Sequence, residues 1–233
     1  MIILAVDTAS TSCSVSIVDG TSVLSEYMVN HKDTHSRFVM EMIHTMLAAC
    51  RLRASDLDGI AVTTGPGSFT GLRIGLSTVK GLALAIDKPL VGVNSLEVLA
   101  RQIGGPGSYP LVCPMMDARR SEVYAAVYRL SDGKMTCESA PRAVRPEKAL
   151  QNITEPCIFA GDGAVAYRDL ITSTLPELAI VADGGDQFIR AATIGRMAVE
   201  RFMARDIDDL GALKPVYLRQ SDAEKNLQHA VAT

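Results

Sequence analysis

The fold is decided by the stretch Val6-Asp7-Thr8-Ala9-Ser10, which has a counterpart 110 residues later in Met116-Asp117-Ala118-Arg119-Arg120. In both places an apolar strand ends near an aspartate, and four or five polar residues lead into a strand with alternating apolar residues. Each second strand then reaches a glycine-containing hairpin, at Asp19-Gly20 and at Asp132-Gly133. The sequence therefore predicts an internal duplication.

Further elements surround this repeated unit. After strands at 2–8, 13–18 and 22–29, apolar residues at three- and four-residue spacings predict a helix from Asp33 or Thr34 to about Arg53. The order β-β-β-α-β-α-β-α in the first half indicates a mixed sheet flanked by helices, and a β-β-β-α unit used twice is the architecture of the actin, hexokinase and heat-shock ATPase superfamily. We therefore expect an α/β fold with two domains, each a mixed sheet flanked by helices. The remaining predicted elements are strands 59–64, 89–93, 123–128 and 157–160 and helices 70–86, 96–103, 164–173 and 187–204.

The strongest break in the chain is Gly104-Gly105-Pro106-Gly107-Ser108. It predicts a boundary between a first domain of residues 1–105 and a second domain of residues 106–233. The last helical segment is expected to pack back on the first domain. A chain of 233 residues is long enough to form two hydrophobic cores.

Composition argues against several classes of function. A net charge of −3 and 5% aromatic residues disfavour nucleic-acid binding by the chain alone, because that needs clustered Lys and Arg and stacking rings. The five cysteines are scattered and never form a Cys-x-x-Cys pair, which excludes a disulfide framework and a four-thiolate zinc site. The start Met1–Val6 lacks the basic segment of a signal peptide, and no apolar run approaches the roughly 18 residues that span a bilayer. These features predict a cytoplasmic protein.

A glycine-rich turn, Gly65-Pro66-Gly67-Ser68, joins a predicted strand to a predicted helix. Free N–H groups at such a helix start can bind an anion, but the glycine spacing fits neither a Walker loop nor a dinucleotide fingerprint. The alternative is a tight turn with a Ser or Thr cap. Each mid-helix glycine costs about 1 kcal/mol, so the small residues predict the close approach of another helix or strand. They are Gly71, Gly75, Gly81 and Ala85. The apolar residues around them fit either a domain core or a partner surface.

Two sets of residues could carry chemistry. His31 and His35 have the spacing of two metal ligands, but His31 precedes the expected helix, so no metal site is predicted. There is no Gly-x-Ser-x-Gly nucleophile elbow, and no catalytic residue is predicted. The two aspartates stand where ATPases of the duplicated fold keep phosphate-facing hairpins, but both hairpins lack glycine. The candidates for a weak nucleotide site are Asp7, Thr8, Ser10, Asp117, Arg119, Gly161 and Gly163.

The run Thr64-Gly65-Pro66-Gly67-Ser68-Phe69-Thr70-Gly71-Leu72-Arg73-Ile74-Gly75 closely resembles the signature of the TsaB family, formerly YeaZ. The resemblance covers nearly the whole chain. It implies a subunit of the bacterial machinery that makes threonylcarbamoyladenosine beside the tRNA anticodon. Supporting pieces are the opening Val6-Asp7-Thr8-Ala9, His35-Ser36, Val91-Gly92-Val93-Asn94-Ser95-Leu96, Asp117-Ala118-Arg119 and the late Pro215-Val216-Tyr217-Leu218-Arg219.

The catalytic relative of that family, TsaD, shares the fold but carries a metal-binding His-x-x-x-His after the equivalent of Gly92-Val93-Asn94. Here the two positions are Ser95 and Leu99, which cannot replace imidazoles on a metal. The resemblance therefore implies a non-catalytic scaffold that activates TsaD and supports threonylcarbamoyl transfer to tRNA adenosine. Two enzymatic alternatives stay open. An ATPase or small-molecule kinase is disfavoured by the missing hairpin glycines, and a metallopeptidase-like hydrolase by Ser95 and Leu99.

The resemblance also implies partners. Helices 38–47 and 72–85 would pair with the corresponding helices of TsaD, or with a second copy of this chain in a homodimer. An ATPase, TsaE, would join the pair. The complex alone would contact tRNA, ATP or ADP would bind at its interface rather than to the lone chain, and no membrane is involved. Gly75→Leu or Met42→Asp is expected to abolish the TsaD contact and leave a folded chain. The implied interface residues are His35, Phe38, Val39, Met42, Met46, Leu72, Arg73, Gly75, Leu76, Val79 and Lys80.

Overall fold

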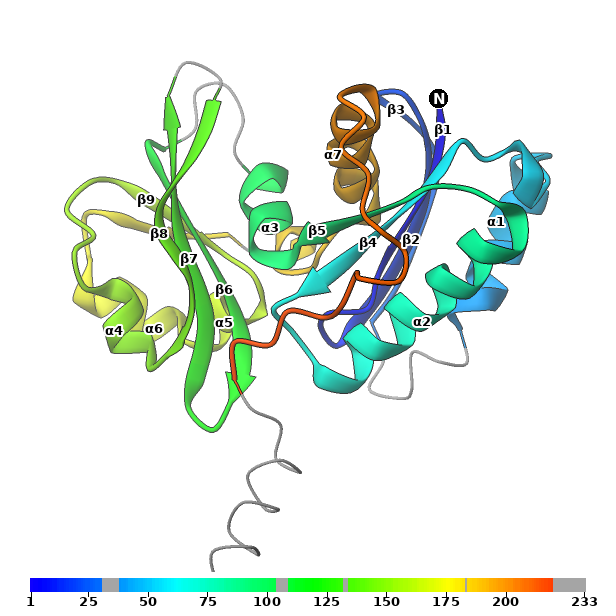
Figure 1. The fold of residues 1–233 in the computed structure, drawn as a ribbon. Helices are drawn as coiled ribbons and strands as arrows, with labels where there is room; N and C mark the ends of the chain where they lie inside the picture. Colours follow the sequence, from blue (N-terminus) through cyan, green and yellow to red (C-terminus); the bar gives the residue numbers. More distant parts are fainter. Residues whose placement is uncertain (31–37, 104–108, 132–133, 183, 220–233) are drawn as a thin grey trace, which may run out of the picture.

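The first half of the chain forms a five-stranded sheet with the order β3-β2-β1-β4-β5. The computed structural model describes residues 1–30, 38–103, 109–131, 134–182 and 184–219 (Figure 1). Strands β1 to β3 form an antiparallel meander, while β4 and β5 run parallel to β1. The strand bounds are β1 Ile2–Asp7, β2 Ser12–Asp19, β3 Ser22–Asn30, β4 Gly59–Gly65 and β5 Leu90–Asn94.

The second sheet repeats the first strand by strand. Its order is β10-β9-β6-β7-β8, again with an antiparallel meander of three strands and two strands parallel to the first of them. This topology confirms the α/β class with two mixed sheets, and it supports the duplication read from the sequence. The bounds are β6 Leu111–Arg119, β7 Glu122–Ser131, β8 Lys134–Val144, β9 Cys157–Ala160 and β10 Ala179–Val181.

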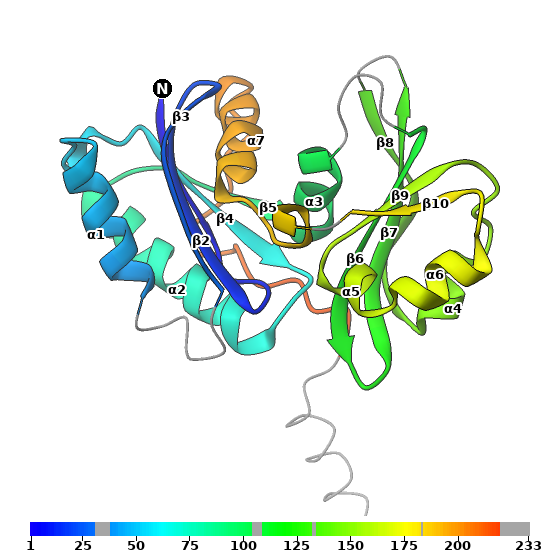
Figure 2. The same cartoon turned by 180° about the vertical axis from the view of Figure 1, so that it is seen from behind.

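The helices form outer layers and an inner layer (Figures 1 and 2). Helices α1 (Val39–Ala49) and α2 (Phe69–Ile86) cover the outer face of the first sheet, and α7 (Ala191–Met203) covers its inner face. Helix α3 (Ser95–Ile103) follows the first sheet but contacts β6, β7 and β9 of the second. Helix α7 follows the second sheet but contacts β1, β2, β4 and β5 of the first. The short helices α4 (Pro146–Leu150), α5 (Asp162–Ala166) and α6 (Arg168–Thr174) cover the second sheet.

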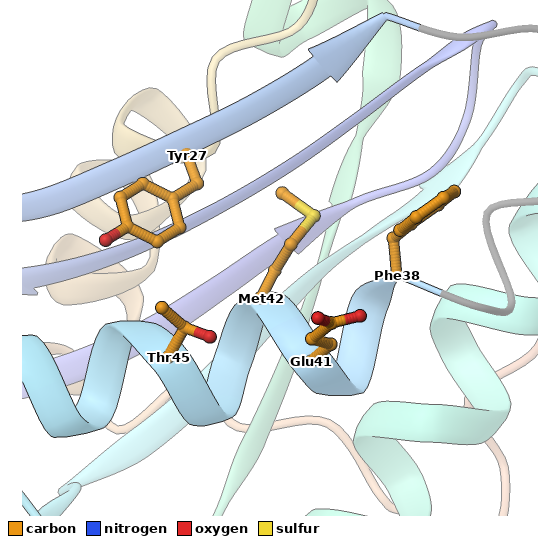
Figure 3. A pocket seen from close by; sticks show the side chains of 5 residues that line it. All are labelled: Tyr27, Phe38, Glu41, Met42 and Thr45. Atoms are coloured by element: carbon orange, nitrogen blue, oxygen red, sulfur yellow. The ribbon is translucent and has the colours of Figure 1, made fainter.

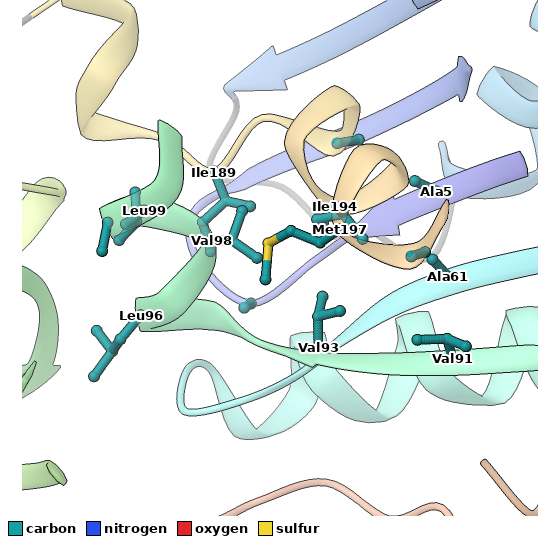
Figure 4. Packing of buried hydrophobic residues seen from close by; sticks show 14 of the residues in the cluster. Ala5, Ala61, Val91, Val93, Leu96, Val98, Leu99, Ile189, Ile194 and Met197 are labelled. Atoms are coloured by element: carbon teal, nitrogen blue, oxygen red, sulfur yellow. The ribbon is translucent and has the colours of Figure 1, made fainter. Parts of the chain in front are cut away.

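The core extends through both domains. Along β1, Leu4 packs toward α1 and α2 while Ile3 packs toward α7, as the two-residue period of a strand requires. The inner cluster continues from α7 to Leu96 and Leu99 of α3 (Figure 4). It also contains Val112 and other buried residues of β6. The two domains therefore share this inner cluster, and each has a further cluster of its own under its outer helices.

Polar side chains of the first sheet hold the start of α7. The hydroxyl of Ser14 accepts a hydrogen bond from the Ala191 amide at 2.9 Å, and Glu26 accepts one from the Ala192 amide at 2.9 Å. Glu26 also pairs with the Arg190 guanidinium. A carboxylate is favourable at a helix N-terminus because the first N–H groups have no partner within the helix. These contacts fix α7 to a sheet that is distant in sequence.

The structure corrects one helix boundary in the first half. Helix α1 ends at Ala49 rather than near Arg53, because Arg51 adopts a left-handed conformation with φ of 57° that stops the helix. Its expected start at Asp33 or Thr34 lies outside the described residues. The predicted domain boundary at 104–108 also lies outside them. Strands β1 to β5 and helices α2 and α3 lie within about one residue of the sequence prediction.

In the second half the predicted helix 164–173 is wrong, because two short helices, α5 and α6, are separated at Tyr167. The predicted helix 187–204 begins only at Ala191, because Gly184–Gln187 form a separate 3₁₀ turn. Strand β10 and helix α4 were not predicted. They are three and five residues long, too short to show a clear period.

One statement from composition needs correction as well. Helix α2 has 18 residues with a mean hydropathy of 1.3, so by length and composition it is long and apolar enough to span a bilayer. Of these residues, 33% are buried within the protein. The buried ones include Leu72, Leu76 and Val79, which pack in the domain core. The apolar character of α2 therefore has one clear cause in packing on the first sheet.

Candidate functional site

Asp7 ends strand β1 and lies where the first domain faces the second. It is completely buried, and its Oδ1 accepts hydrogen bonds from the Thr63 hydroxyl at 2.6 Å and the Ala9 amide at 3.1 Å. Its Oδ2 has no hydrogen-bond partner among the described residues. Burial raises the pKa of Asp7 to about 7, and the charge of Asp162 in the second domain adds to the rise. The charge of Asp162 thus acts on Asp7 across the domain junction.

The second domain contains the counterpart of this arrangement. Asp117 Oδ1 accepts from the Arg119 amide at 2.8 Å, just as Asp7 accepts from the residue two positions later. Gly65 and Gly161, which follow the equivalent strand segments of β4 and β9, have φ of 122° and 101°. Such values favour glycine, so the duplication extends to backbone conformation. Asp117 is exposed, however, and its other oxygen lies 3.8 Å from the Arg119 guanidinium.

Several of the predicted nucleotide-binding residues are engaged by the protein itself. The Thr8 hydroxyl donates to the Gly71 carbonyl at 2.7 Å, and the Ser10 hydroxyl bonds to Ser12 at 2.9 Å. A Cβ at Gly161 would overlap the Met115 carbonyl, and one at Gly163 would lie 2.8 Å from the backbone of β6. These glycines therefore allow α5 to pack on β6. Among the seven candidates, Asp7 is the one with an unpartnered buried oxygen.

Asp7 and Asp162 differ in their hydrogen bonds. Burial raises the pKa of Asp162, and the hydrogen bond that Asp162 accepts from the Asp117 amide at 3.0 Å opposes the rise. A carboxyl that is neutral near pH 7 can donate a proton or a hydrogen bond, as Asp7 could. Among the described residues, no three His, Cys, Asp or Glu side chains group as a metal site.

The glycine-rich turn is a capped turn, as the second sequence alternative predicted. The Ser68 hydroxyl caps α2 by accepting from the Gly71 amide at 3.3 Å, and the Ser68 amide donates to the Ala9 carbonyl at 2.6 Å. A Cβ at Gly71 would overlap the Thr8 carbonyl, and one at Gly75 would overlap the Thr8 hydroxyl. The small residues at the start of α2 thus admit the turn after β1 rather than a second helix.

Ser95 and Leu99, the two positions that the family resemblance singled out, lie in the interior. The Asn94 side chain caps α3 by accepting from the Leu96 and Glu97 amides at 3.0 and 3.1 Å. Ser95 begins α3 and is fully buried, and its hydroxyl has no partner among the described residues. Leu99 is 1% exposed and packs in the core shared by both domains. Both positions therefore belong to the packing of α3.

Most of the predicted interface residues are buried in this chain, so their role as contact residues stays a prediction that the lone chain does not test. Hydrophobic side chains at three- and four-residue spacings on α1 and α2 face the first sheet because that face excludes water. Phe38 and Lys80 are half-buried and Arg73 is exposed, whereas His35 lies outside the described residues. The buried members are Val39, Met42, Met46, Leu72, Gly75, Leu76 and Val79.

The burial of these residues changes how an interface can be tested. Met42 is 7% exposed, so aspartate there would place a charge in the core. Leucine at Gly75 would collide with Thr8. Both substitutions are expected to unfold the domain rather than leave a folded chain, so neither isolates a partner contact.

The opposite side of the same helices is exposed and poor in charge. Leu84 is 74% exposed and Met40 is 50% exposed, and a Cβ at Gly81 would meet no atom within 4 Å. Small side chains between the large ones leave room for another helix to approach closely. We call this surface the outer α1–α2 face. Its residues are Met40, His44, Ala48, Ser77, Gly81 and Leu84.

A hollow of about 260 Å³ lies between strand β3 and the start of α1 (Figure 3). Tyr27, Phe38 and Met42 form its apolar walls, and Glu41 and Thr45 add polar groups. The structure thus brings two of the predicted interface residues, Phe38 and Met42, to one surface feature. The hollow shares no residue with the site around Asp7.

The sequence did not reveal the contacts of the C-terminal segment. Tyr217 stacks on Phe69 with ring centroids 4.3 Å apart, and the Arg73 guanidinium lies 3.9 Å from the Phe69 centroid. The sequence analysis used Pro215-Val216-Tyr217-Leu218-Arg219 only as support for the family resemblance and predicted no contacts for it. It has no alternation or helical period, so a contact over more than 140 residues left no local signal.

Comparisons with known proteins match nearly the whole chain to one group of relatives. The family model described as "TsaD: tRNA N6-adenosine threonylcarbamoyltransferase" matches residues 22–227. The chain is 31% identical to the tRNA threonylcarbamoyladenosine biosynthesis protein TsaB of Bacillus subtilis (strain 168), over 96% of each chain. It is 30% identical to TsaB of Escherichia coli (strain K12), over 97% of this chain and 98% of that one.

Solved structures show the same relationship. YeaZ from Pseudomonas aeruginosa superposes with a TM-score of 0.80 at 27% identity, over 93% of this chain and 99% of that one. Component A of the Acidaminococcus fermentans (R)-2-hydroxyglutaryl-CoA dehydratase superposes with a TM-score of 0.55 at 11% identity, over 86% and 98% of the chains, and shares the fold alone. The chain therefore belongs to the TsaB (YeaZ) family, within the wider family of the tRNA N6-adenosine threonylcarbamoyltransferase TsaD.

Proposed function

We propose that this chain is a non-catalytic subunit that binds TsaD in the cytoplasm and supports threonylcarbamoyl transfer to tRNA adenosine. TsaE joins this pair, and ATP or ADP binds at the interface of the complex. Without TsaD, a second copy of the chain occupies the same surface. Contacts with tRNA come from the complex, in keeping with the net charge of −3.

The outer α1–α2 face is the observation that carries this proposal. Leu84, near the end of α2, is 74% exposed, and Met40, at the start of α1, is 50% exposed. Covering large apolar side chains stabilises an association by roughly 25 cal/mol for each Å² removed from water. The exposed glycine and serine of α2 would let a partner helix lie close to the backbone. The buried faces of the same helices keep this surface rigid.

The absence of catalysis in the lone chain is supported by the site around α3. Ser95 and Leu99 fill the core where TsaD carries its two metal-binding histidines. A kinase function has less support than a scaffold function. The hydroxyls of Thr8 and Ser10, which could have bound a phosphate, form hydrogen bonds within the chain.

Reconstituted transfer tests the proposal. We expect the purified chain alone to give no threonylcarbamoyl transfer to tRNA, and TsaD with TsaE to need this chain for activity. Leu84→Asp is expected to lower the transfer rate at limiting chain concentration by roughly tenfold or more, because a charge must then be buried against the partner. Met203→Asp is the matched control, since Met203 is also 74% exposed but lies at the end of α7. Transfer by the lone chain, or equal loss in both variants, would contradict the proposal.

A further inference from the structure

After α7 the chain crosses back over the first domain and reaches the second. This segment, residues 208–219, is drawn in orange and red in Figure 1. At its start Asp208 forms an antiparallel bridge with Leu90 and accepts a hydrogen bond from the Gly92 amide at 2.8 Å. The Arg201 guanidinium lies 3.2 Å from the same carboxylate. The start of the segment is thus fixed to the edge strand β5.

The middle of the segment lies against the end of β4. The Val216 amide donates to the Thr64 carbonyl at 2.7 Å. A Cβ at Gly65 would lie 2.5 Å from the Val216 carbonyl oxygen, so only a glycine lets the two backbones approach this closely. The hydroxyl of Thr63, the residue before Thr64 in β4, donates a hydrogen bond to Asp7. The segment therefore passes within two residues of the group that holds Asp7.

Tyr217 then attaches the segment to α2. Its ring stacks on Phe69 at an interplanar angle of 25°, and its hydroxyl oxygen accepts a hydrogen bond from Arg73 Nε at 3.0 Å. The Arg73 guanidinium covers the same Phe69 ring. Tyr217 is 38% exposed, so this attachment is at the surface and can be broken without opening the core.

The end of the segment, Leu218 and Arg219, contacts the second domain. Leu218 packs on the core shared by both domains. Arg219 Nη1 lies 3.3 Å from Glu122 Oε2 and 3.5 Å from the Arg119 carbonyl, which both flank the turn between β6 and β7. That turn contains three consecutive residues, Arg119 to Ser121, with positive φ. The segment thus links the turn after Asp117 to the turn after β4.

We propose that residues 208–219 are an interdomain strap, which holds the two domains closed over the Asp7 carboxylate and releases them when its Tyr217 and Arg219 contacts break. Asp7 is fully buried and has one unpartnered oxygen, and its other oxygen accepts from Thr63, the residue before the strap's contact at Thr64. The strap is held by one aromatic stack, two ion pairs, a few hydrogen bonds and the packing of its partly buried leucines, whereas α3, α7 and their core remain as the hinge. The strap does not depend on the proposed binding of TsaD.

Distance measurements between the domains test the strap in the full chain. Spin labels are placed at Ser77→Cys on α2 and Lys148→Cys on α4, with the exposed or half-buried Cys137 and Cys50 changed to serine. We expect one narrow distance distribution in this parent. Tyr217→Ala with Arg219→Ala is expected to shift the distribution to longer distances and to broaden it. Lys214→Ala, an exposed side chain in the same segment, is the control and is expected to leave it unchanged.

In the same variants, the accessibility of the Asp7 carboxyl can be measured by chemical labelling. Coupling of a water-soluble carbodiimide and glycine amide to Asp7, followed by mass spectrometry, is expected to be roughly tenfold faster or more when the strap is released. The single variants Tyr217→Ala and Arg219→Ala give intermediate changes if the double variant is too unstable to study. Unchanged interdomain distances in folded strap variants would overturn the proposal, and so would unchanged labelling of Asp7.

Discussion

Gly71→Ala is expected to lower the free energy of unfolding by about 3 kcal/mol or more. The added Cβ would overlap the Thr8 carbonyl oxygen, which belongs to the backbone at the end of β1. Moving that backbone away would break the hydrogen bond from the Thr8 hydroxyl to the Gly71 carbonyl. It would also displace Asp7, the preceding residue. Urea unfolding followed by circular dichroism measures the change.

Gly81→Ala is the matched control on the same helix. Gly81 is exposed, and a Cβ there meets nothing within 4 Å. Alanine is favoured over glycine in a helix, so this variant is expected to be more stable by about 0.5–1 kcal/mol. Effects of the same sign in Gly71→Ala and Gly81→Ala would contradict the close contact between α2 and the turn after β1.

The stability of the chain is expected to fall as the pH rises from about 4 to about 7, through the ionisation of Asp7. Its pKa is raised by burial from an ordinary 3.8 to about 7 in the folded chain. Between these values the folded state keeps the proton that the unfolded state loses, so the stabilising contribution is complete below pH 3.8 and is lost as the pH passes 7. The total contribution is up to roughly 4 kcal/mol.

Asp7→Asn isolates this effect. The amide oxygen can still accept from Thr63 and Ala9, but the side chain no longer ionises. The variant is therefore expected to show a much smaller decline between pH 4 and 7 in chemical unfolding than the parent chain, with the part due to Asp162 remaining. An equal decline in both proteins would show that Asp7 is not its source.

The duplicated architecture could be predicted because it depends on local patterns. Strands β1 and β2 are short apolar or alternating runs bounded by turn residues, and such runs allow few alternatives. The match between the stretches at Asp7 and Asp117 then predicted a second sheet with the same connections. Helices α5 and α6 were read as one helix, since nothing in the sequence marks the break at Tyr167.

The environment of the candidate site could be predicted only in part. Helix α2 is apolar on more than one side, so its sequence does not indicate which residues face the first sheet and which face solvent. Gly71 and Gly75 correctly predicted a close contact, but the partner is Thr8, more than 60 residues away. The burial of Asp7 likewise depends on Thr63 and on the packing of the second domain. These contacts between distant segments leave no local pattern.

The central claim is that TsaD binds the outer α1–α2 face. The affinity of the chain for TsaD tests this claim most directly. Analytical ultracentrifugation of equimolar mixtures gives both the mass of the complex and its dissociation constant. We expect a one-to-one complex with the parent chain and with Met203→Asp, and at least about 100-fold weaker binding of Leu84→Asp, because a charge would be buried in the helix contact. Leu84→Asp binding TsaD as tightly as the parent chain does would contradict the account.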